Sequence, residues 1–427
     1  MSDLKTIDRF SSLPDLVLDK VFQILYIEHQ GPSRPLSKKL EKYFYQYSYR
    51  ALYVSSYKQL TKLCARGTTK MLEQTWQLTV DIPFLDKESN RPLLEGPDAG
   101  WPRDEVFIDF LLKFGQETDQ VTIIGSSRLA QFMLSPSVTS EAFPGLRILS
   151  LSSTFSDLED PFHPAHYAPL VYCPTLATLV LNIRRSPDSI KPSSKPFPEH
   201  YFSTLSPNSF TLKGPLGASP FCSNLIALFD RLQLLSLDDT SDSSLSLPTL
   251  LAQVVKPEQV SSIGIGCINI EDLVAVEVAT ELARFTKLIQ LRFRNGFYGD
   301  SSEFGSALGR LKLRSIAFGD GAKVDEKLIW TLLSGSKRMK SLKVVILDEV
   351  HFKGEDEADV EAEDQGEREE YNRRIWGMLD LADRKDVILT GKTIDEFTEK
   401  MGWAPRRPIT TSQATLEAFE RMSMADL

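Results

Sequence analysis

The chain has 427 residues, of which 42% are hydrophobic and 25% are charged, which is ordinary for a soluble globular protein. It shows no secretory leader at its start and no apolar run near the roughly 18 residues that a membrane span needs. Its four cysteines lie far apart without a C-x-x-C pair, which fits a reducing compartment. We therefore expect a protein of the cytoplasm, the nucleus or both.

The net charge of −9 originates in one segment. Residues 354–370 carry ten acidic residues and one arginine (1 − 10 = −9), so the remainder of the chain is formally neutral. Without a basic field to collect phosphates, nucleic-acid binding is disfavoured. The acidic segment itself indicates a solvated loop, and a docking site for a basic partner is the alternative.

Residues 12–27 are typical of an opening helix, with Ser12 as its cap and Pro14 in its first turn. Apolar residues cover most of its circumference, so it is either enclosed in a core or completed by a partner protein. A Gly- and Pro-containing break follows at residues 28–36. Residues 37–65 then predict a second helix, for which Gly67 is a suitable stop.

These two segments resemble a known motif. The string LPDLVLDKVFQIL resembles the first helix of an F-box, and YRALYVSSYKQLTKL resembles its closing helix, with an insertion around residues 28–48 between them. The resemblance implies a helical module over residues 1–67 that binds a Skp-family linker protein of a cullin–RING ubiquitin ligase. The implied linker-binding residues are Leu13, Pro14, Leu16, Leu18, Val21, Phe22, Leu25 and Val54. The alternative is that these residues only pack against residues 40–63 within one small domain.

A strand at residues 75–80, a helix at 104–114 and a strand at 121–124 are expected next. From residue 143 onward, segments that read roughly L-x-x-L-x-L return eight times, at intervals of 25 to 31 residues. Their middle residues are Leu149, Leu179, Phe210, Leu235, Ile263, Leu291, Ile316 and Val345. This interval is typical of leucine-rich repeats, in which each unit holds one strand and one convex segment.

We therefore predict an α/β fold: a small helical F-box-like module, then an irregular leucine-rich-repeat solenoid over residues 68–398. The solenoid would have a curved parallel sheet with helices on its convex face and the acidic loop 354–370 inserted. Residues 399–427 would form a terminal helix or tail. The later convex helices are expected at residues 271–285, 303–310, 325–337 and 368–382, and a last strand at 387–389.

In each repeat the leucines of the strand point inward, so the residues between them face the concave surface. These concave residues are Ser150, Ser152, Val180, Asn182, Ser236, Asp238, Gly264, Gly266, Arg292, Arg294, Ala317, Gly319, Ile346 and Asp348. Arg292 and Arg294 are the strongest candidates for substrate binding, because arginines on a rigid sheet suit carboxylate or phosphate recognition. Asn182, Asp238 and Asp348 are further candidates. Plain solvation of these strand residues is the alternative.

Catalytic signatures are missing from the sequence, which has no phosphate-binding loop, H-E-x-x-H zinc motif or G-x-S-x-G elbow. Gly264-x-Gly266 lies inside an expected strand and lacks the third glycine of a dinucleotide site. His163 and His166 could ligate a metal but are better explained as surface residues. The acidic run Asp238, Asp239 and Asp242 is better explained as loop acids after a strand than as a calcium site. We expect no enzymatic activity, metal or cofactor.

The preferred hypothesis is a substrate-recognition adaptor of a Skp–cullin–F-box ubiquitin ligase. The N-terminal helices would bind the linker protein, which connects to the cullin scaffold, and the repeats would bind a protein substrate. The alternative is a free-standing leucine-rich-repeat scaffold whose helical module only caps the array. A GTPase regulator of the Ran-activating type, which also pairs such repeats with an acidic segment, is a third possibility.

Overall fold

The structure of the chain is a computed structural model. It describes residues 13–27, 40–48, 50–66, 75–82, 104–113, 118–126, 129–130, 133–134, 143–155, 167, 170, 173–185, 205–216, 220–240, 246–267, 272–294, 298–299, 302–319, 321–324, 326–334, 339–348, 350–352 and 365–400. The chain divides into two compact units. The first holds residues 1–154 and 165–176, and the second holds residues 155–164 and 177–427. The expected domain limits at residues 67 and 398 stay predictions.

The first unit combines helices with a parallel sheet. Its strands, in sheet order, are β1 (Ala51–Val54), β2 (Gln77–Asp81), β3 (Gln120–Ser126) and β4 (Ile148–Phe155). Its longer helices are α1 (Asp15–Ile27), α2 (Glu41–Ser48), α3 (Tyr57–Arg66) and α5 (Asp104–Lys113). The expected elements near residues 12–27, 75–80, 104–114 and 121–124 are thereby confirmed.

The single helix expected over residues 37–65 is wrong. Strand β1 interrupts it, pairing Ala51 with Gln77 and Val54 with Val80. Helix α3 then makes a new start, because the Ser56 hydroxyl accepts a hydrogen bond from the Gln59 amide at 3.2 Å, as a helix cap does. The segment that resembles the closing helix of an F-box is therefore a strand, a turn and a helix, and the strand belongs to the sheet.

The second unit is a longer array of the same kind. Its main strands, in sheet order, are β5 (Thr178–Arg185), β6 (Ser209–Gly214), β7 (Leu234–Asp239), β8 (Ser262–Cys267), β9 (Gln290–Arg294), β11 (Ser315–Phe318), β13 (Val344–Leu347) and β15 (Ile388–Thr390). All of these neighbours pair in parallel. The short strands β10 (Tyr298–Gly299), β12 (Lys323–Val324) and β14 (His351–Phe352) form a second parallel sheet.

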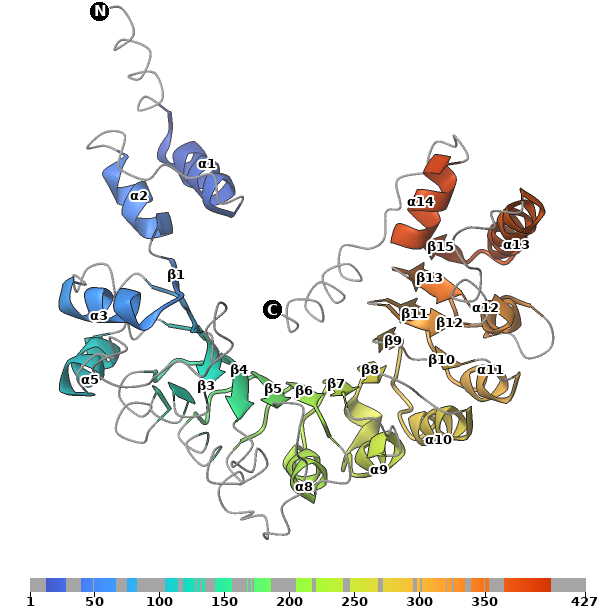
Figure 1. Ribbon diagram of the computed structural model, residues 1–427, viewed down its shortest axis with the longest axis horizontal. Coiled ribbons are helices and arrows are strands. Elements are labelled where there is room, and N and C mark those ends of the chain that lie inside the picture. The colour runs from blue at the N-terminus through green and yellow to red at the C-terminus, as the bar shows by residue number, and fades with distance from the viewer. Residues whose placement is uncertain are drawn as a thin grey trace, which may run out of the picture. The chain divides into compact units, whose positions relative to one another are not determined.

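The helices of the second unit follow one side of its strands (Figure 1). They are α8 (Pro220–Leu228), α9 (Ser246–Ala252), α10 (Asp272–Leu282), α11 (Ser302–Leu308), α12 (Glu326–Leu333) and α13 (Gln365–Arg384). A short 3₁₀ turn, η7 (Pro257–Gln259), precedes β8, and α14 (Lys392–Lys400) follows β15. The expected convex helices and the last strand are confirmed. Helix α13 begins three residues earlier than expected, so the loop expected over residues 354–370 is wrong for residues 365–370, while residues 354–364 lie outside the described part of the chain.

The register confirms the repeats. Leu179, Phe210, Leu235, Ile263, Leu291, Ile316 and Val345 are successive Cα partners across the second unit. In the first unit Leu149 is aligned in the same way with Val121, Leu78 and Leu52. All eight predicted positions are fully buried, which is the expected result of stacking units that cannot bury their apolar faces alone.

The core of the second unit lies between its strands and helices. The ring of Phe210 on β6 meets that of Phe229 after α8, with centroids 4.9 Å apart. Phe293 on β9 packs against Phe304 of α11 at 5.8 Å and stacks with Phe318 of β11 at 5.3 Å. Neighbouring repeats thus share aromatic contacts as well as backbone pairing, and these contacts keep the strands in one register.

Candidate protein-binding surfaces

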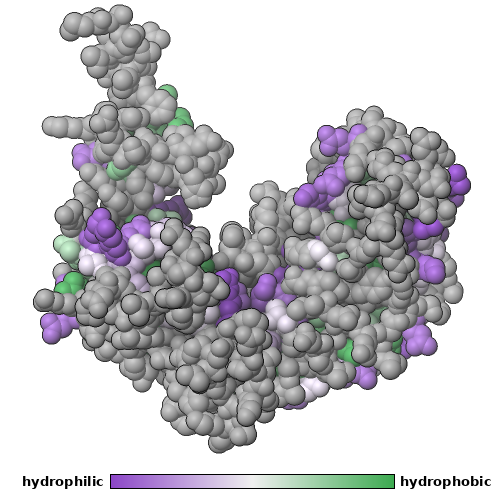
Figure 2. Space-filling view, viewed as in Figure 1, coloured by the Kyte–Doolittle hydropathy of each residue, from purple (hydrophilic) through white to green (hydrophobic). Residues whose placement is uncertain are grey.

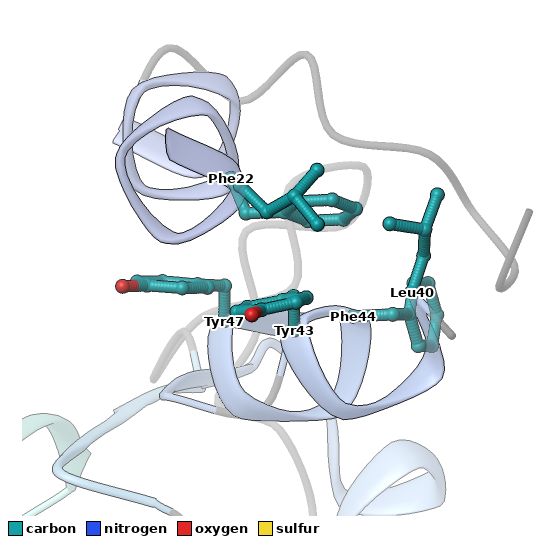
Figure 3. Packing of buried hydrophobic residues seen from close by; sticks show 6 residues of the cluster. Phe22, Leu40, Tyr43, Phe44 and Tyr47 are labelled. Carbon is teal, nitrogen blue, oxygen red and sulfur yellow. The ribbon is translucent and has the colours of Figure 1, made fainter. Parts of the chain in front are cut away.

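Helices α1 and α2 pack face to face and enclose a small aromatic core (Figure 3). Phe22 of α1 stacks on Tyr43 of α2, with ring centroids 5.8 Å apart. Leu18 lies one helical turn before Phe22 and is also fully buried in this cluster. The remaining members of the cluster, all at one side of α2, are Leu40, Phe44 and Tyr47.

Polar contacts at the rim orient the two helices. The Lys42 ammonium lies 2.8 Å from the Asp15 carboxylate, and the Tyr47 hydroxyl donates to Asp19 Oδ1 at 2.6 Å. Burial and the bond to Asp19 raise the pKa of Tyr47 to about 12, so this hydroxyl stays a donor at physiological pH. The α1–α2 pair therefore has its own core and its own polar clamp.

One side of α1 remains apolar and open. Leu16 is 75% exposed and Val17 is 42% exposed, and Figure 2 shows hydrophobic atoms at the surface over this helix. Leu16 lies two residues before Leu18, about 200° around the helix, so it points away from the α2 contact. We call Pro14, Leu16 and Val17 the open side of α1, since all three are exposed.

The eight predicted linker-binding residues are thus in different places. Leu18 and Phe22 are sealed inside the α1–α2 core, against which Leu13 also packs, and Val21 is half-buried. Val54 is buried within β1 and pairs with Val80. Leu25 belongs to α1, but its side chain lies outside the described part of the chain. The structure leaves Pro14 and Leu16 of this set facing solvent, with Val17 as an additional residue.

A second candidate surface is the side of the second unit's strands opposite α8–α13, which we call the inner face. It consists of the residues that alternate with the buried leucines, and their register forms two rows across the sheet. The first row runs Val180, Thr211, Ser236, Gly264, Arg292, Ala317, Ile346. The second row runs Asn182, Lys213, Asp238, Gly266, Arg294.

Arg294 crosses a whole strand on this face. Its Nη2 donates a hydrogen bond to the Ser236 hydroxyl on β7, although Arg294 is on β9 and β8 lies between them. The intervening Cα partners on β8 are Gly264 and Gly266, which carry no side chain to obstruct the arginine. Arg294 is only 3% exposed, so it is a buried part of this face. The two glycines, which lie inside a strand as expected, make this crossing possible.

The other charged residues of the inner face are also placed by their neighbours. Asp238 is 1% exposed, and its Oδ2 lies 3.2 Å from the Lys213 ammonium on β6. Arg292 is half-buried, and its Nη2 would lie 3.6 Å from a Cβ built on Gly319. Arg292 therefore extends toward β11, whereas Arg294 extends toward β7. The two predicted binding arginines share a strand but point to different neighbours.

The remaining predicted substrate-binding residues are Asn182, at one end of the second row, and Asp348, which lies outside both rows. Asn182 is half-buried on β5. Asp348 follows β13, and its Oδ1 accepts a hydrogen bond from the Lys392 amide at the start of α14 at 2.9 Å. Asp238 and Asp239 are strand residues of β7, so the expectation of loop acids is wrong for these two, and Asp242 lies outside the described residues.

Two polar partners on this face, Lys213 on β6 and Ser236 on β7, were not predicted as binding residues. Lys213 pairs with Asp238, and Ser236 accepts from Arg294. The available signal was the pair Gly264 and Gly266, because two side-chain gaps on one strand allow residues of the flanking strands to meet. Reading the rows across strands, and not along each strand, would have found them.

Metal ligands, membrane-spanning helices and reactive thiols are the other features that bear on function. Among them, no group of three His, Cys, Asp or Glu side chains could hold a metal ion, while His163 and His166 lie outside them. No helix within the described ranges combines the length and apolarity of a membrane span. Burial raises the pKa of the thiols of Cys64, Cys173 and Cys267 to about 12.

The chain was compared with known proteins. No family model matches it, and no curated protein matches it. One similar solved structure is the leucine-rich repeat-containing protein LegL7 from Legionella pneumophila, with 14% identity, a TM-score of 0.42 and coverage of 71% of this chain and 91% of that chain. Another is a Bacteroides fragilis protein, with 12% identity, a TM-score of 0.36 and coverage of 81% and 74%. The repeat architecture described above follows from the strand register and not from these distant similarities.

Proposed function

We propose that this chain is a non-enzymatic adaptor that binds two proteins through two surfaces. The open side of α1 would dock on a Skp-family linker protein, which connects to a cullin scaffold, and the inner face would hold a protein substrate. The observation that carries the first half is the exposure of Leu16 and Val17 on a helix whose opposite side is already sealed by α2. Repeat sheets of this kind offer an extended binding face, which supports the second half.

The open side of α1 is the better-supported docking surface because its apolar side chains do not contribute to the core of the α1–α2 pair. Leu18 and Phe22 already supply the α1–α2 core, so Leu16 adds nothing to it. An exposed leucine next to an exposed valine on a rigid helix is a suitable anchor for a groove in a partner. Within the described residues the segment after α2 is strand β1, so this docking would use α1 and α2.

Capture of a purified Skp-family linker protein by the full chain tests this proposal. Leu16→Asp combined with Val17→Asp should abolish capture and leave the thermal transition unchanged, because both side chains are exposed. Leu18→Ala should instead lower stability by about 2–5 kcal/mol, since it empties a fully buried site. Val255→Asp, at a 54% exposed valine of the second unit, is the matched control and should capture linker normally.

The second candidate function is a free-standing protein-binding scaffold. The pairing of β1 with β2 favours this function. It connects helices α1 and α2 directly to the sheet of the first unit, as expected of a helical cap at the end of a repeat array. If the unmodified chain captures no linker protein, the hypothesis of a ubiquitin-ligase adaptor is wrong and the hypothesis of a free-standing scaffold remains. In that case the Leu16 and Val17 changes should affect neither stability nor substrate binding.

A further inference from the structure

We propose that this chain associates with itself, the acidic segment 354–370 of one copy binding a basic patch on the second unit of another copy. The basic patch is formed by the four connections that lead from α10, α11, α12 and α13 into β9, β11, β13 and β15. Because these strands are parallel, all four connections lie at the amino ends of the strands. The patch is therefore distinct from the open side of α1 and from the inner face.

Positive charge is concentrated in these connections. Residues 283–289, 309–314, 334–343 and 385–387 contain ten basic residues and one acidic residue (10 − 1 = +9). Including Glu281, Asp380, Asp383 and Arg384 from the ends of α10 and α13 leaves a net charge of +7 (9 + 1 − 3). The two preceding connections, residues 229–233 and 253–261, are neutral. The part of the chain outside the acidic segment is thus neutral only as a whole, and its last four repeats gather positive charge at one side.

Backbone hydrogen bonds hold three of these connections side by side. The Ile289 carbonyl accepts a hydrogen bond from the Arg314 amide at 2.8 Å, and the Arg314 carbonyl accepts one from the Lys343 amide at 2.8 Å. Because neighbouring parallel segments lie about 4.8 Å apart, Arg314 and Lys343 place like charges on adjacent segments. Like charges at this spacing repel one another, and an anion bound over them removes that cost.

Most cations of the basic patch have no carboxylate partner among the described residues. The exposed cations without one are Lys287, Arg310, Lys312, Arg314, Lys340 and Lys385. Lys343 does have one, since its ammonium lies 2.9 Å from the Asp386 carboxylate. Arg284 is also committed, because it pairs with Glu281 at 3.0 Å and donates to the Ala252 carbonyl at 3.0 Å. Arg284 therefore holds the repeats together, and the other cations are available to a partner.

Helix dipoles do not account for the central cations of the patch. A basic side chain in or directly after the last turn of a helix stabilises the helix, which explains positions such as Arg310 and Lys385. Lys312 and Arg314 follow the end of α11 by four and six residues, and Lys340 follows the end of α12 by seven. The dipole effect does not extend that far. These three residues are the best candidates for direct contact with an anionic partner.

The acidic segment has the complementary charge of −9, but it cannot lie along the basic patch of its own chain. It precedes α13, whose 20 residues span about 30 Å and end at the patch. Residues 353–364, which connect β14 to α13, span at most about 43 Å when fully extended. The return from the patch to the start of α13 uses about 30 Å of this length, so at most the tip of the segment reaches the patch. A second copy has no such restriction.

A second copy fits the basic patch better than a nucleic acid does. The chain carries a net charge of −9, which repels a long polyanion at a distance. Asp386, which is 92% exposed, also lies within the patch. When the acidic segment of one copy lies on the basic patch of another, the two largest concentrations of like charge in the chain neutralise each other. The contact joins two different surfaces, so every copy offers one of each.

Sedimentation velocity of the purified full chain over a range of concentrations tests this inference. We expect self-association that increases with concentration. Raising the salt from about 0.1 M to about 1 M should weaken it at least about tenfold, because the Debye length falls from about 10 Å to about 3 Å.

Two variants separate the two surfaces. In the patch variant, Lys312→Glu, Arg314→Glu and Lys340→Glu change three exposed residues, so the chain should become monomeric with its thermal transition unchanged. In the segment variant, the seven acidic residues between Glu355 and Asp364 are changed to their amides, and it should also be monomeric. A mixture of the two variants should form a 1:1 dimer, because one supplies the acidic segment and the other supplies the basic patch.

The matched control carries Lys58→Glu, Lys62→Glu and Arg231→Glu, which change the net charge by the same amount at exposed residues outside the patch. It should associate as the unmodified chain does. A fluorescent single-stranded oligonucleotide should bind the unmodified chain no better than it binds the patch variant.

Three sedimentation results overturn the inference: the unmodified chain stays monomeric, the patch variant still associates, or the mixture of the two variants stays monomeric. Oligonucleotide binding that the patch variant loses would assign the basic patch to nucleic acid in place of a second copy. Linker capture through α1 is measured separately, so its failure leaves this inference untouched.

Discussion

Replacing Gly266 with valine tests whether the inner face depends on a strand without side chains. Gly266 is the Cα partner of both Asp238 on β7 and Arg294 on β9. The Arg294 side chain must pass over it to donate its hydrogen bond to Ser236. A valine side chain on the same face would occupy that path.

The expected effect can be estimated from two opposing terms. On an unobstructed strand, valine is preferred over glycine by up to about 1 kcal/mol. Loss of the bond between the Arg294 guanidinium and Ser236 costs about 1.5–3 kcal/mol, because one partner is charged and both are buried. Gly266→Val should therefore lower the free energy of unfolding by about 0.5–2 kcal/mol, the opposite of its effect on an ordinary strand.

A double-mutant cycle with Ser236→Ala separates this mechanism from general overpacking. If valine acts by displacing Arg294 from Ser236, the Gly266→Val change should cost about 1.5–3 kcal/mol less in the Ser236→Ala background, because the bond is already absent there. Urea unfolding followed by circular dichroism provides the four free energies. Strictly additive effects, or a Gly266→Val protein more stable than the parent, would refute the crossing of β8 by Arg294.

Three further outcomes are expected. Gly391→Ala should destabilise the chain by about 2–4 kcal/mol in urea unfolding, because its φ is +114° and a Cβ would lie 2.5 Å from a carbonyl oxygen at the end of β13; an unchanged midpoint would contradict this close approach. Cys173 and Cys267 should resist a thiol reagent at pH 8 in the native protein and react once urea unfolds it, since burial raises both pKa values to about 12. The hydrogen bond from Lys256 lowers the pKa of Asp230, so the stabilisation that this pair provides is present above the unfolded value near 3.9 and is lost as the pH falls through the folded value. Asp230→Asn should cost at most about 0.5 kcal/mol near neutral pH and nothing near pH 2, and an equal cost at both would reject the pair as its cause.

The repeat strands could be predicted because their signal is local and periodic. Residues such as Leu235 and Ile263 recur at the interval of one stacked unit, and the same interval places them opposite one another in the sheet. The alternation along each strand then assigns the inner face without further information. Nothing beyond strand period and repeat length is needed for that part of the fold.

Strand β1 could not be predicted in the same way. Its four residues lie between two helical segments, and their strand character depends on pairing with β2, more than 20 residues later. A local signal for the break did exist: the Ser56 hydroxyl caps α3, and the Gln59 side-chain oxygen accepts from the Ser55 amide at 2.9 Å. This Ser-x-x-Gln pattern marks a helix start, and it contradicts one helix running through residues 37–65.

The directions in which the two arginine side chains extend could not be predicted from the sequence, for a different reason. Alternation places Arg292 and Arg294 on one face, but it says nothing about the direction in which a long side chain extends across that face. The choice depends on gaps in neighbouring strands, here Gly264 and Gly266 on one side and Gly319 on the other. Such gaps become visible only when the register of the sheet is known.

The connection between helix α2 and the sheet of the first unit bears directly on the adaptor proposal. Helix α2 ends at Ser48 and β1 begins at Ala51, so only two residues separate them. The Arg50 carbonyl accepts hydrogen bonds from the amides of Trp76 and Gln77, each at 2.9 Å, and its guanidinium lies 5.0 Å from the Trp76 ring centroid. A short connection anchored at three points transmits the position of the helices to the sheet better than a flexible linker would. A partner held on the open side of α1 would therefore be held in a defined position relative to β1 and β2, which is the property that an adaptor requires to raise the effective concentration of one bound protein near another.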